Sequence, residues 1–323
     1  MQNLTNNILG VSALLSIAVV SAINPVSAAI KKEVSFESQG QVLVGDLYFP
    51  DSYKSGDRLP AVIVSGSWTS VKEQMPAGYA QKLADKGYAA LAFDFRGWGE
   101  SAQGSPVPLK YAENPQAKTQ DILAAAEFLS AQANIRSEHI ATLGICASAG
   151  YAIDAAHQSA IISSVAVVAP WLHDKAIVNE VYGENIPALL QATVNAEESG
   201  EALILEAASD TNEQSVMYKA SYYTSPTRGA IVEYDNKFST FSWKPWLSYD
   251  AIQTASLIKD PVLLVHSPAA AIPMGAERFA AQGGNNVELI MLDDITQFDF
   301  YDSPEVITEA LSLVDAHFKI SMR

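Results

Sequence analysis

The sequence predicts an α/β fold with a mostly parallel central sheet, flanking helices and an inserted lid. Apolar runs rich in β-branched residues alternate with longer helical stretches, which is typical of parallel strands joined by crossover helices. An apolar fraction of 49% over 323 residues is enough for one large core. The alternation stops at about 171–250, and an insertion of this size is expected to fold over a binding site. We therefore expect one domain, residues 29–323, with a lid at about 171–250. The alternative is a structural cap with no part in binding.

The elements of this sheet can be placed along the chain. Short apolar runs predict strands at 41–49, 60–64, 88–94, 140–144, 164–169, 262–265 and 287–292. Longer amphipathic stretches predict helices at 75–86, 114–133, 147–158 and 304–319.

The first 28 residues predict a secretory signal peptide. Residues 8–23 carry no charge, and Val26, Ser27 and Ala28 form a small-residue cleavage site. The segment before this run has no Lys or Arg, so an uncleaved membrane anchor is the alternative. We expect a secreted or periplasmic protein that has no stable membrane association after cleavage.

Charge and cysteine content limit the partners. The net charge of −16 excludes a nucleic-acid surface, since phosphate binding requires clustered Lys and Arg. A small uncharged or apolar substrate is expected instead. No cofactor or metal is predicted, and the oligomeric state cannot be predicted from the sequence. The single cysteine, Cys146, cannot form an internal disulfide; it either packs as a small hydrophobe or is reactive.

Residues 140–150 predict a strand, a sharp turn and a helix with Cys146 at the turn. Gly144 and Ser148 flank the cysteine by two positions, which matches the nucleophile elbow, where larger side chains would clash. A thiol at the first turn of a helix is expected to favour the thiolate. Two alternatives are a shifted frame that makes Ser148 the nucleophile and a Cys146 that only packs.

The run FDFRGWGES at 93–101 resembles the strand-and-loop motif of α/β hydrolases, and the resemblance extends from about Lys31 to the C-terminus. A cysteine in the elbow is similar to the dienelactone hydrolase branch, whose Cys-His-Asp triad opens lactones and esters. The resemblance therefore implies an α/β-hydrolase fold. Residues 65–68 correspond to the oxyanion loop, so the backbone N–H groups of Trp68 and Ala147 are expected to form the oxyanion hole.

The chain departs from the family pattern at both partners of the nucleophile. The family's acid follows the strand at 262–265, where this chain has no carboxylate before Glu277. The family's histidine is expected near Gln297, and an amide cannot act as a general base.

Five histidines could replace the missing base. His266 is the favoured catalytic candidate, because it follows a strand at the correct edge of the sheet, with Asp294 or Asp299 as its orienting acid. Its alternative role is a hydrogen bond to loop backbone. His173 is expected at the hinge of the lid. The other three, His139, His157 and His317, lie too far from Cys146 or face solvent by their place in the chain.

All five tryptophans are predicted around one apolar pocket. Trp98 and Trp171 are the predicted substrate-binding residues, and the others are Trp68, Trp243 and Trp246. Ordinary core packing is the alternative. The function expected is hydrolysis of a small uncharged carboxylic ester, lactone or thioester by Cys146, or else binding of a small molecule by a catalytically weakened homologue. A redox role is disfavoured, since no second cysteine can resolve an oxidised thiol.

Overall fold

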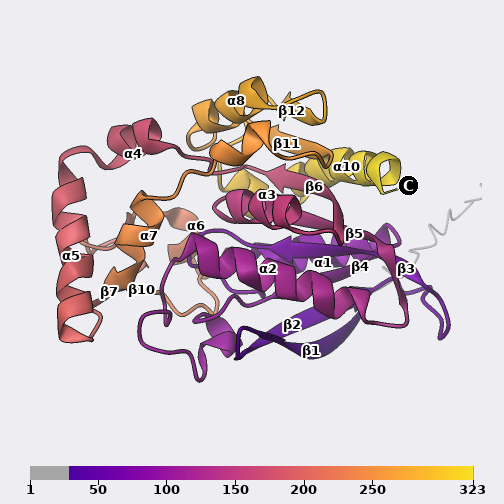
Figure 1. Ribbon diagram of the computed structural model, residues 1–323, viewed down its shortest axis with the longest axis horizontal. Coiled ribbons are helices and arrows are strands. Elements are labelled where there is room, and N and C mark those ends of the chain that lie inside the picture. Colours follow the sequence, from indigo (N-terminus) through magenta and orange to yellow (C-terminus); the bar gives the residue numbers. More distant parts are fainter. Residues whose placement is uncertain (1–28, 323) are drawn as a thin grey trace, which may run out of the picture.

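A twisted eight-stranded sheet forms the centre of the computed structural model, which describes residues 29–322 (Figure 1). The strands between the two edges of this sheet are nearly continuous buried apolar runs, as expected when both faces of a sheet are covered by helices. The predicted α/β fold with a mostly parallel sheet is confirmed. In spatial order the strands are β1 (Ile30–Ser38), β2 (Gln41–Phe49), β4 (Ala89–Phe93), β3 (Leu59–Ser65), β5 (Ile135–Ile145), β6 (Ile162–Val168), β11 (Val262–His266) and β12 (Val287–Met291).

One edge of the sheet is an antiparallel hairpin whose first strand the sequence did not predict. β1 pairs with β2 along its whole length, and β2 pairs antiparallel with β4. The connecting residues Gln39 and Gly40 have φ values of 50° and 80°, as in the tight turns that match the twist of a hairpin. β1 was missed because it is an exposed edge strand with charged residues, so it lacks an apolar run.

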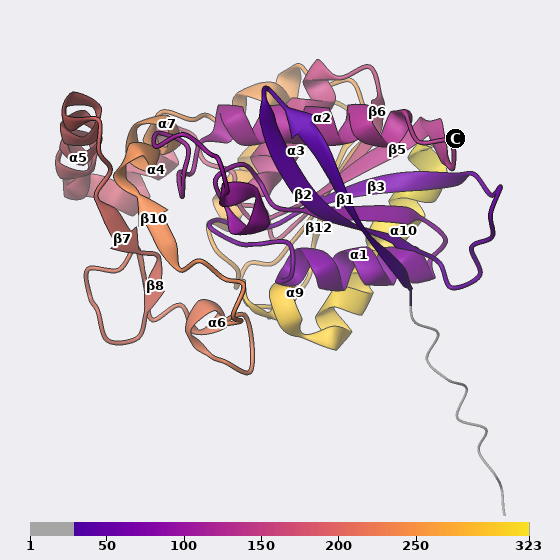
Figure 2. The ribbon, with the colours of Figure 1, turned by 90° about the horizontal axis from the view of Figure 1, so that it is seen from below.

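Helices cover both faces of the sheet; Figure 2 shows α2 on one side and α1 on the other. The helix α2 begins at Pro115, a residue favoured at the first position of a helix. Asn114 caps it by accepting a hydrogen bond from the Ala117 N–H. The helix α8 was not predicted. The helices of this layer are α1 (Met75–Asp85), α2 (Pro115–Ser130), α3 (Ser148–Gln158), α8 (Pro273–Gln282), α9 (Asp299–Asp302) and α10 (Pro304–Ser321).

Residues 171–250 leave the sheet after β6 and build a separate layer beside it (Figure 1). α5 lies farthest from the sheet, at the left in that view. Two small sheets are present, with β7 paired to β10 and β8 paired to β9. The elements are α4 (Lys175–Tyr182), α5 (Ile186–Ser199), β7 (Ile204–Glu206), β8 (Ala208–Ser209), β9 (Met217–Tyr218), α6 (Ser221–Thr224), β10 (Lys237–Ser239) and α7 (Trp243–Leu247).

Within residues 29–322, no helix combines the length and the apolar character needed to cross a membrane. The predicted signal peptide at 1–28, and the alternative of an uncleaved anchor, lie outside the described residues.

Candidate active site

Cys146 occupies the sharp turn between β5 and α3. Its φ is +59°, in the left-handed region that costs a non-glycine residue roughly 1–2 kcal/mol. The turn is fastened by two backbone bonds, from the Cys146 N–H to the Val168 carbonyl at 3.1 Å and from the Trp171 N–H to the Cys146 carbonyl at 2.9 Å. A Cβ on Gly144 would lie 2.6 Å from the Ser148 carbonyl oxygen. The strain and the close approach are those of a nucleophile elbow.

Three hydrogen-bond donors surround the sulfur of Cys146. Burial raises the pKa of this thiol above its ordinary value, while hydrogen bonds from Tyr301 and from the backbone N–H groups of Trp68 and Ala147 lower it. Since burial has the larger effect, the free protein favours the neutral thiol and not the thiolate that the sequence predicts. The backbone N–H groups of Trp68 and Ala147, the predicted oxyanion-hole donors, both approach the sulfur of Cys146.

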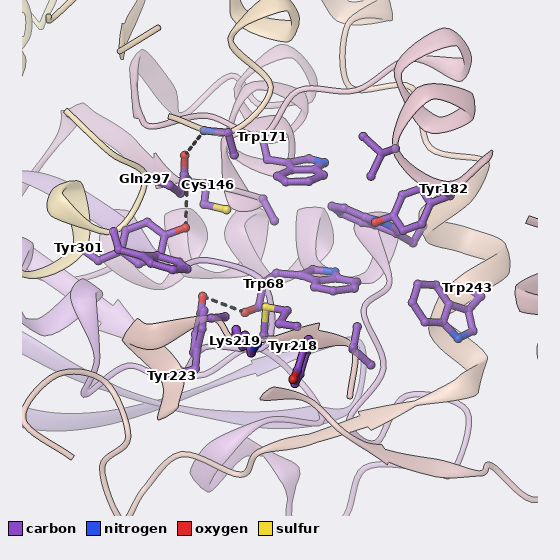
Figure 3. Close-up of a pocket in the computed structure, with 18 residues that line it drawn as sticks. Trp68, Cys146, Trp171, Tyr182, Tyr218, Lys219, Tyr223, Trp243, Gln297 and Tyr301 are labelled. Carbon is purple, nitrogen blue, oxygen red and sulfur yellow. Dashed lines mark hydrogen bonds between the residues drawn. The ribbon is translucent and has the colours of Figure 1, made fainter. Parts of the chain in front are cut away.

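The sulfur faces a cavity of about 450 Å³ (Figure 3), a size typical of small-molecule sites. Lys219 is the one charged side chain among the described residues that line it, and none of those lining residues is a histidine or a carboxylate. Segment 171–250 supplies more than half of the wall. The large aromatic side chains of the wall include Trp68, Trp171, Trp243, Trp246, Tyr182 and Tyr223.

Gln297 lies in the cavity wall beside Cys146, in the loop after β12 where the family's histidine was expected. The Ala271 N–H donates to Gln297 Oε1 at 3.0 Å. Gln297 Nε2 donates to the Ala169 carbonyl at 2.9 Å and to the Tyr301 hydroxyl at 3.0 Å. The dashed lines in Figure 3 follow the amide to Tyr301. A chain of polar groups therefore runs from Gln297 through Tyr301 to Cys146.

His266, the predicted base, is completely buried at the end of β11 and is not among the residues that line the cavity. Its Nε2 donates to the Ala271 carbonyl at 3.1 Å, and Nδ1 has no partner among the described residues. Burial lowers the pKa of His266 to about 4. Asp294 is exposed, and Asp299 caps its own loop by accepting from the Thr296 N–H at 2.9 Å. The structure does not bring His266 to the cavity; it places this ring in the backbone-bonded role that was the alternative.

His173 links the sheet to the inserted segment. Its Nδ1 accepts from Trp171 Nε1 at 3.0 Å, and its Nε2 donates to the Trp246 carbonyl at 3.1 Å. Burial lowers the pKa of His173 to about 4, so the ring is neutral and can accept the indole hydrogen bond. His173 thus fixes one wall of the cavity without facing Cys146.

Trp98 and Ser148 lie away from the cavity. Trp98, predicted to bind substrate, is fully buried and donates through Nε1 to the Ala112 carbonyl at 3.3 Å. The hydroxyl of Ser148, the alternative nucleophile, is buried beneath the elbow and donates to the Ser65 carbonyl at 2.8 Å. Both side chains pack inside the fold, whereas Trp171, the other predicted binding residue, does line the cavity.

A buried ion pair supports the elbow from below. Lys118 donates to the carboxylate of Glu113 at 2.8 Å, and both side chains are at most 2% exposed. Glu113 also accepts from the Tyr151 hydroxyl at 2.8 Å, and Tyr151 belongs to the helix that follows Cys146. The backbone N–H of Thr69, next to the oxyanion loop, approaches the same carboxylate at 3.4 Å. This network joins the oxyanion loop to the elbow helix.

A second cluster of charges contains Glu73, Asp94 and Glu100, whose carboxylates lie close enough to hold a cation. The buried ammonium of Lys72 already contacts all three carboxylates. The positive charge of this cluster is therefore supplied by the chain itself, and none of these four residues lines the cavity.

Tyr301 and Lys219 were not singled out from the sequence. Tyr301 lies four residues after Gln297, and this spacing would pair the two side chains on a helix, but Gln297 lies in the turn before α9. Lys219 lies in a segment without a recognisable motif, so no pattern could have placed it in the wall.

Comparison with known families gives a match over most of the chain. The model of the X-Pro dipeptidyl-peptidase family (S15 family) matches residues 39–269. Among curated proteins, PA2218 of Pseudomonas aeruginosa is 29% identical over 86% of this chain and 78% of its own length. YcjY of Escherichia coli K12 is 27% identical over 84% of this chain and 92% of its own length. Both are uncharacterized proteins.

Solved structures with the same fold include those of PA2218 and of hydrolases. The PA2218 crystal structure superposes with a TM-score of 0.76, covering 91% of this chain and 94% of that one, at 24% identity. Dienelactone hydrolase from Anabaena variabilis has a TM-score of 0.53 at 13% identity, covering 91% and 99%. These likenesses establish an α/β-hydrolase fold. They assign no role to Cys146.

Proposed function

The chain belongs to the X-Pro dipeptidyl-peptidase family (S15 family), and we propose that it is a hydrolase that forms an acyl thioester on Cys146. The observation that carries this proposal is the convergence of the Trp68 and Ala147 backbone donors on the Cys146 sulfur, at the floor of the aromatic cavity. Donors fixed in this way stabilise the oxyanion that develops during acyl transfer.

The chemistry has two stages. The sulfur of Cys146 attacks the carbonyl carbon of the substrate, the oxyanion is held by the two backbone N–H groups, and the alcohol or thiol leaves. Water then hydrolyses the thioester and releases the acid. Because half of the residues that line the cavity are aromatic and Lys219 is the one charged residue among them, the substrate we propose is a small uncharged ester, lactone or thioester.

A second candidate function is the binding of a small molecule without turnover. The observation that favours it is Gln297, an amide in the place expected for the base, together with the lack of a histidine among the described lining residues. The candidates differ in one event, the covalent acylation of Cys146.

Acylation can be measured directly. Mature protein is mixed with p-nitrophenyl butyrate and its intact mass is followed beside Cys146→Ala and His266→Gln. We expect wild type to gain one butyryl group and Cys146→Ala to gain none. Wild type that never gains the acyl mass would contradict the hydrolase proposal and leave the binding candidate. Loss of acylation in folded His266→Gln would restore the histidine as the base.

We also propose export of the protein, on the signal-like residues 1–28. The small-molecule substrate, the exclusion of nucleic acid and the absence of stable membrane association after cleavage belong to the same proposal. N-terminal sequencing of protein recovered outside the cytoplasm should begin at Ala29. A mature chain that still begins at Met1 would favour the uncleaved anchor.

A further inference from the structure

Tyr301 is the side-chain hydroxyl that contacts the thiol of Cys146. The residue is 3% exposed and lines the cavity, and its hydroxyl hydrogen-bonds with Cys146. Figure 3 shows Tyr301 and Gln297 on the same side of the sulfur. In an α/β hydrolase that side belongs to the base.

The direction of every hydrogen bond in this group is fixed by the backbone. The Ala271 N–H can only donate, so the atom of Gln297 that faces it is the amide oxygen. The Ala169 carbonyl can only accept, so it faces the amide nitrogen. The second hydrogen of that nitrogen then points to Tyr301 Oη at 3.0 Å.

Tyr301 must therefore accept from Gln297 and use its own hydrogen elsewhere. The remaining neighbour is Cys146, and the bond between them lowers the pKa of the thiol while raising that of the phenol, as expected when the phenol donates to the sulfur. Its oxygen keeps one lone pair free, so it can also accept a proton.

We propose that Tyr301 is the catalytic proton shuttle of this site in place of a histidine, and that Gln297 is its positioning residue. This inference rests on the proposed acyl transfer. As the bond from Cys146 Sγ to the acyl carbon forms, the thiol proton passes to Tyr301 Oη, and in the same step the phenolic proton moves on to the oxygen or sulfur of the leaving group. The protonated leaving group then departs as the alcohol or thiol when its bond to the acyl carbon breaks.

The second stage reverses these transfers. Water attacks the thioester, its proton passes to Tyr301 Oη, and the phenolic proton of Tyr301 returns to Cys146 Sγ as the C–S bond breaks. No net proton, oxidant or cofactor is required. Burial raises the pKa of Tyr301 well above its ordinary value, so the phenol stays protonated at neutral pH and is ready to donate.

The main test compares Tyr301→Phe with Tyr79→Phe. Tyr79 is a matched control, because it is an equally buried phenol that donates to the carbonyl of Phe300, the neighbour of Tyr301, at 2.8 Å, and lies outside the cavity. We expect Tyr301→Phe to slow butyrylation of Cys146 about 100-fold. It should also move the pH midpoint of Cys146 alkylation by iodoacetamide upward, whereas Tyr79→Phe should change neither.

Gln297→Glu tests the positioning role. An ionised carboxylate accepts a hydrogen bond from the phenol and turns the Tyr301 O–H away from Cys146. Acylation should therefore fall as the pH rises through the titration of the new carboxyl and recover below it. An equal loss at every pH would overturn the positioning role.

Failure of the inference and of the proposed function can be distinguished. Wild type that is alkylated but never acylated overturns the hydrolase function. Acylation at the wild-type rate in folded Tyr301→Phe, or an unchanged alkylation midpoint, overturns the shuttle.

Discussion

The two sides of Cys146 are built from different parts of the chain. On one side, the backbone N–H groups of Trp68 and Ala147 donate to the sulfur, and these are the groups we propose as oxyanion donors. On the other side, where the family pattern expects a histidine, the groups are two side chains, Gln297 and the Tyr301 to which it donates. Backbone donors depend on the path of the chain and tolerate almost any side chain, while proton transfer depends on one particular functional group. The fold therefore preserves the first side and leaves the second open to replacement.

The largest expected effect is on the free energy of unfolding, through the buried ion pair that supports the elbow and the loop of Trp68. Lys118→Met leaves the carboxylate of Glu113 buried without its ammonium partner, and breaking a buried ion pair in this way costs about 3–5 kcal/mol. Urea unfolding followed by circular dichroism measures this loss. The double variant Glu113→Gln with Lys118→Met should recover most of it. Equal stability of Lys118→Met and wild type would show that the pair does not hold the elbow.

A smaller effect is the pH dependence of stability that arises from the buried His266. The pKa of His266 falls from 6.5 in the unfolded chain to about 4 on folding. Between these values the unfolded chain binds more protons, so stability is full above pH 6.5 and decreases as the pH falls toward 4. For His266 the loss is at most about 3 kcal/mol.

His266→Gln should reduce this acid-dependent loss, and urea titrations at a series of pH values measure the slope. His173 contributes in the same direction, because burial also lowers its pKa to about 4, so part of the slope remains in the variant. A slope as steep in His266→Gln as in wild type would place the titration elsewhere.

The smallest expected effect is that of a substitution that restores a histidine beside Cys146. Gln297→His puts an imidazole next to Tyr301 and Cys146, and we expect release of the acyl group to quicken about tenfold, at the low end for general-base catalysis because no carboxylate orients the ring. Single-turnover decay of the butyryl adduct measures this rate. A decay no faster than wild type would mean that the acid after β11 is as necessary as the histidine.

The sheet and the elbow could be predicted from the sequence, because apolar periodicity and the small residues Gly144 and Ser148 are local signals. The strand β1 could not, since most of its residues face solvent and four of the nine are charged. The base was assigned to His266 by its place at the carboxyl end of β11, but the side chain at the end of a strand can point to either face. This histidine turns toward Ala271.

No sequence motif could have identified Tyr301 as the partner of Cys146. Tyr301 contacts the sulfur only because the short helix α9 folds back beside the elbow, and Gln297 is oriented by the backbone of Ala169 and Ala271. Trp98 is the opposite case, a residue that was predicted to line the cavity and does not. It follows a strand at the correct edge, yet Lys118 packs over its ring inside the core.

The aromatic wall of the cavity also allows ligand binding to be followed by intrinsic tryptophan fluorescence. Four of the protein's five tryptophans line the space in front of Cys146, and the ring centroid of Trp68 lies 6.1 Å from that of Trp243 and 5.2 Å from that of Trp246. Any molecule that enters this space replaces water against several indole rings at once, so the ultraviolet emission of the protein should respond to the contents of the cavity.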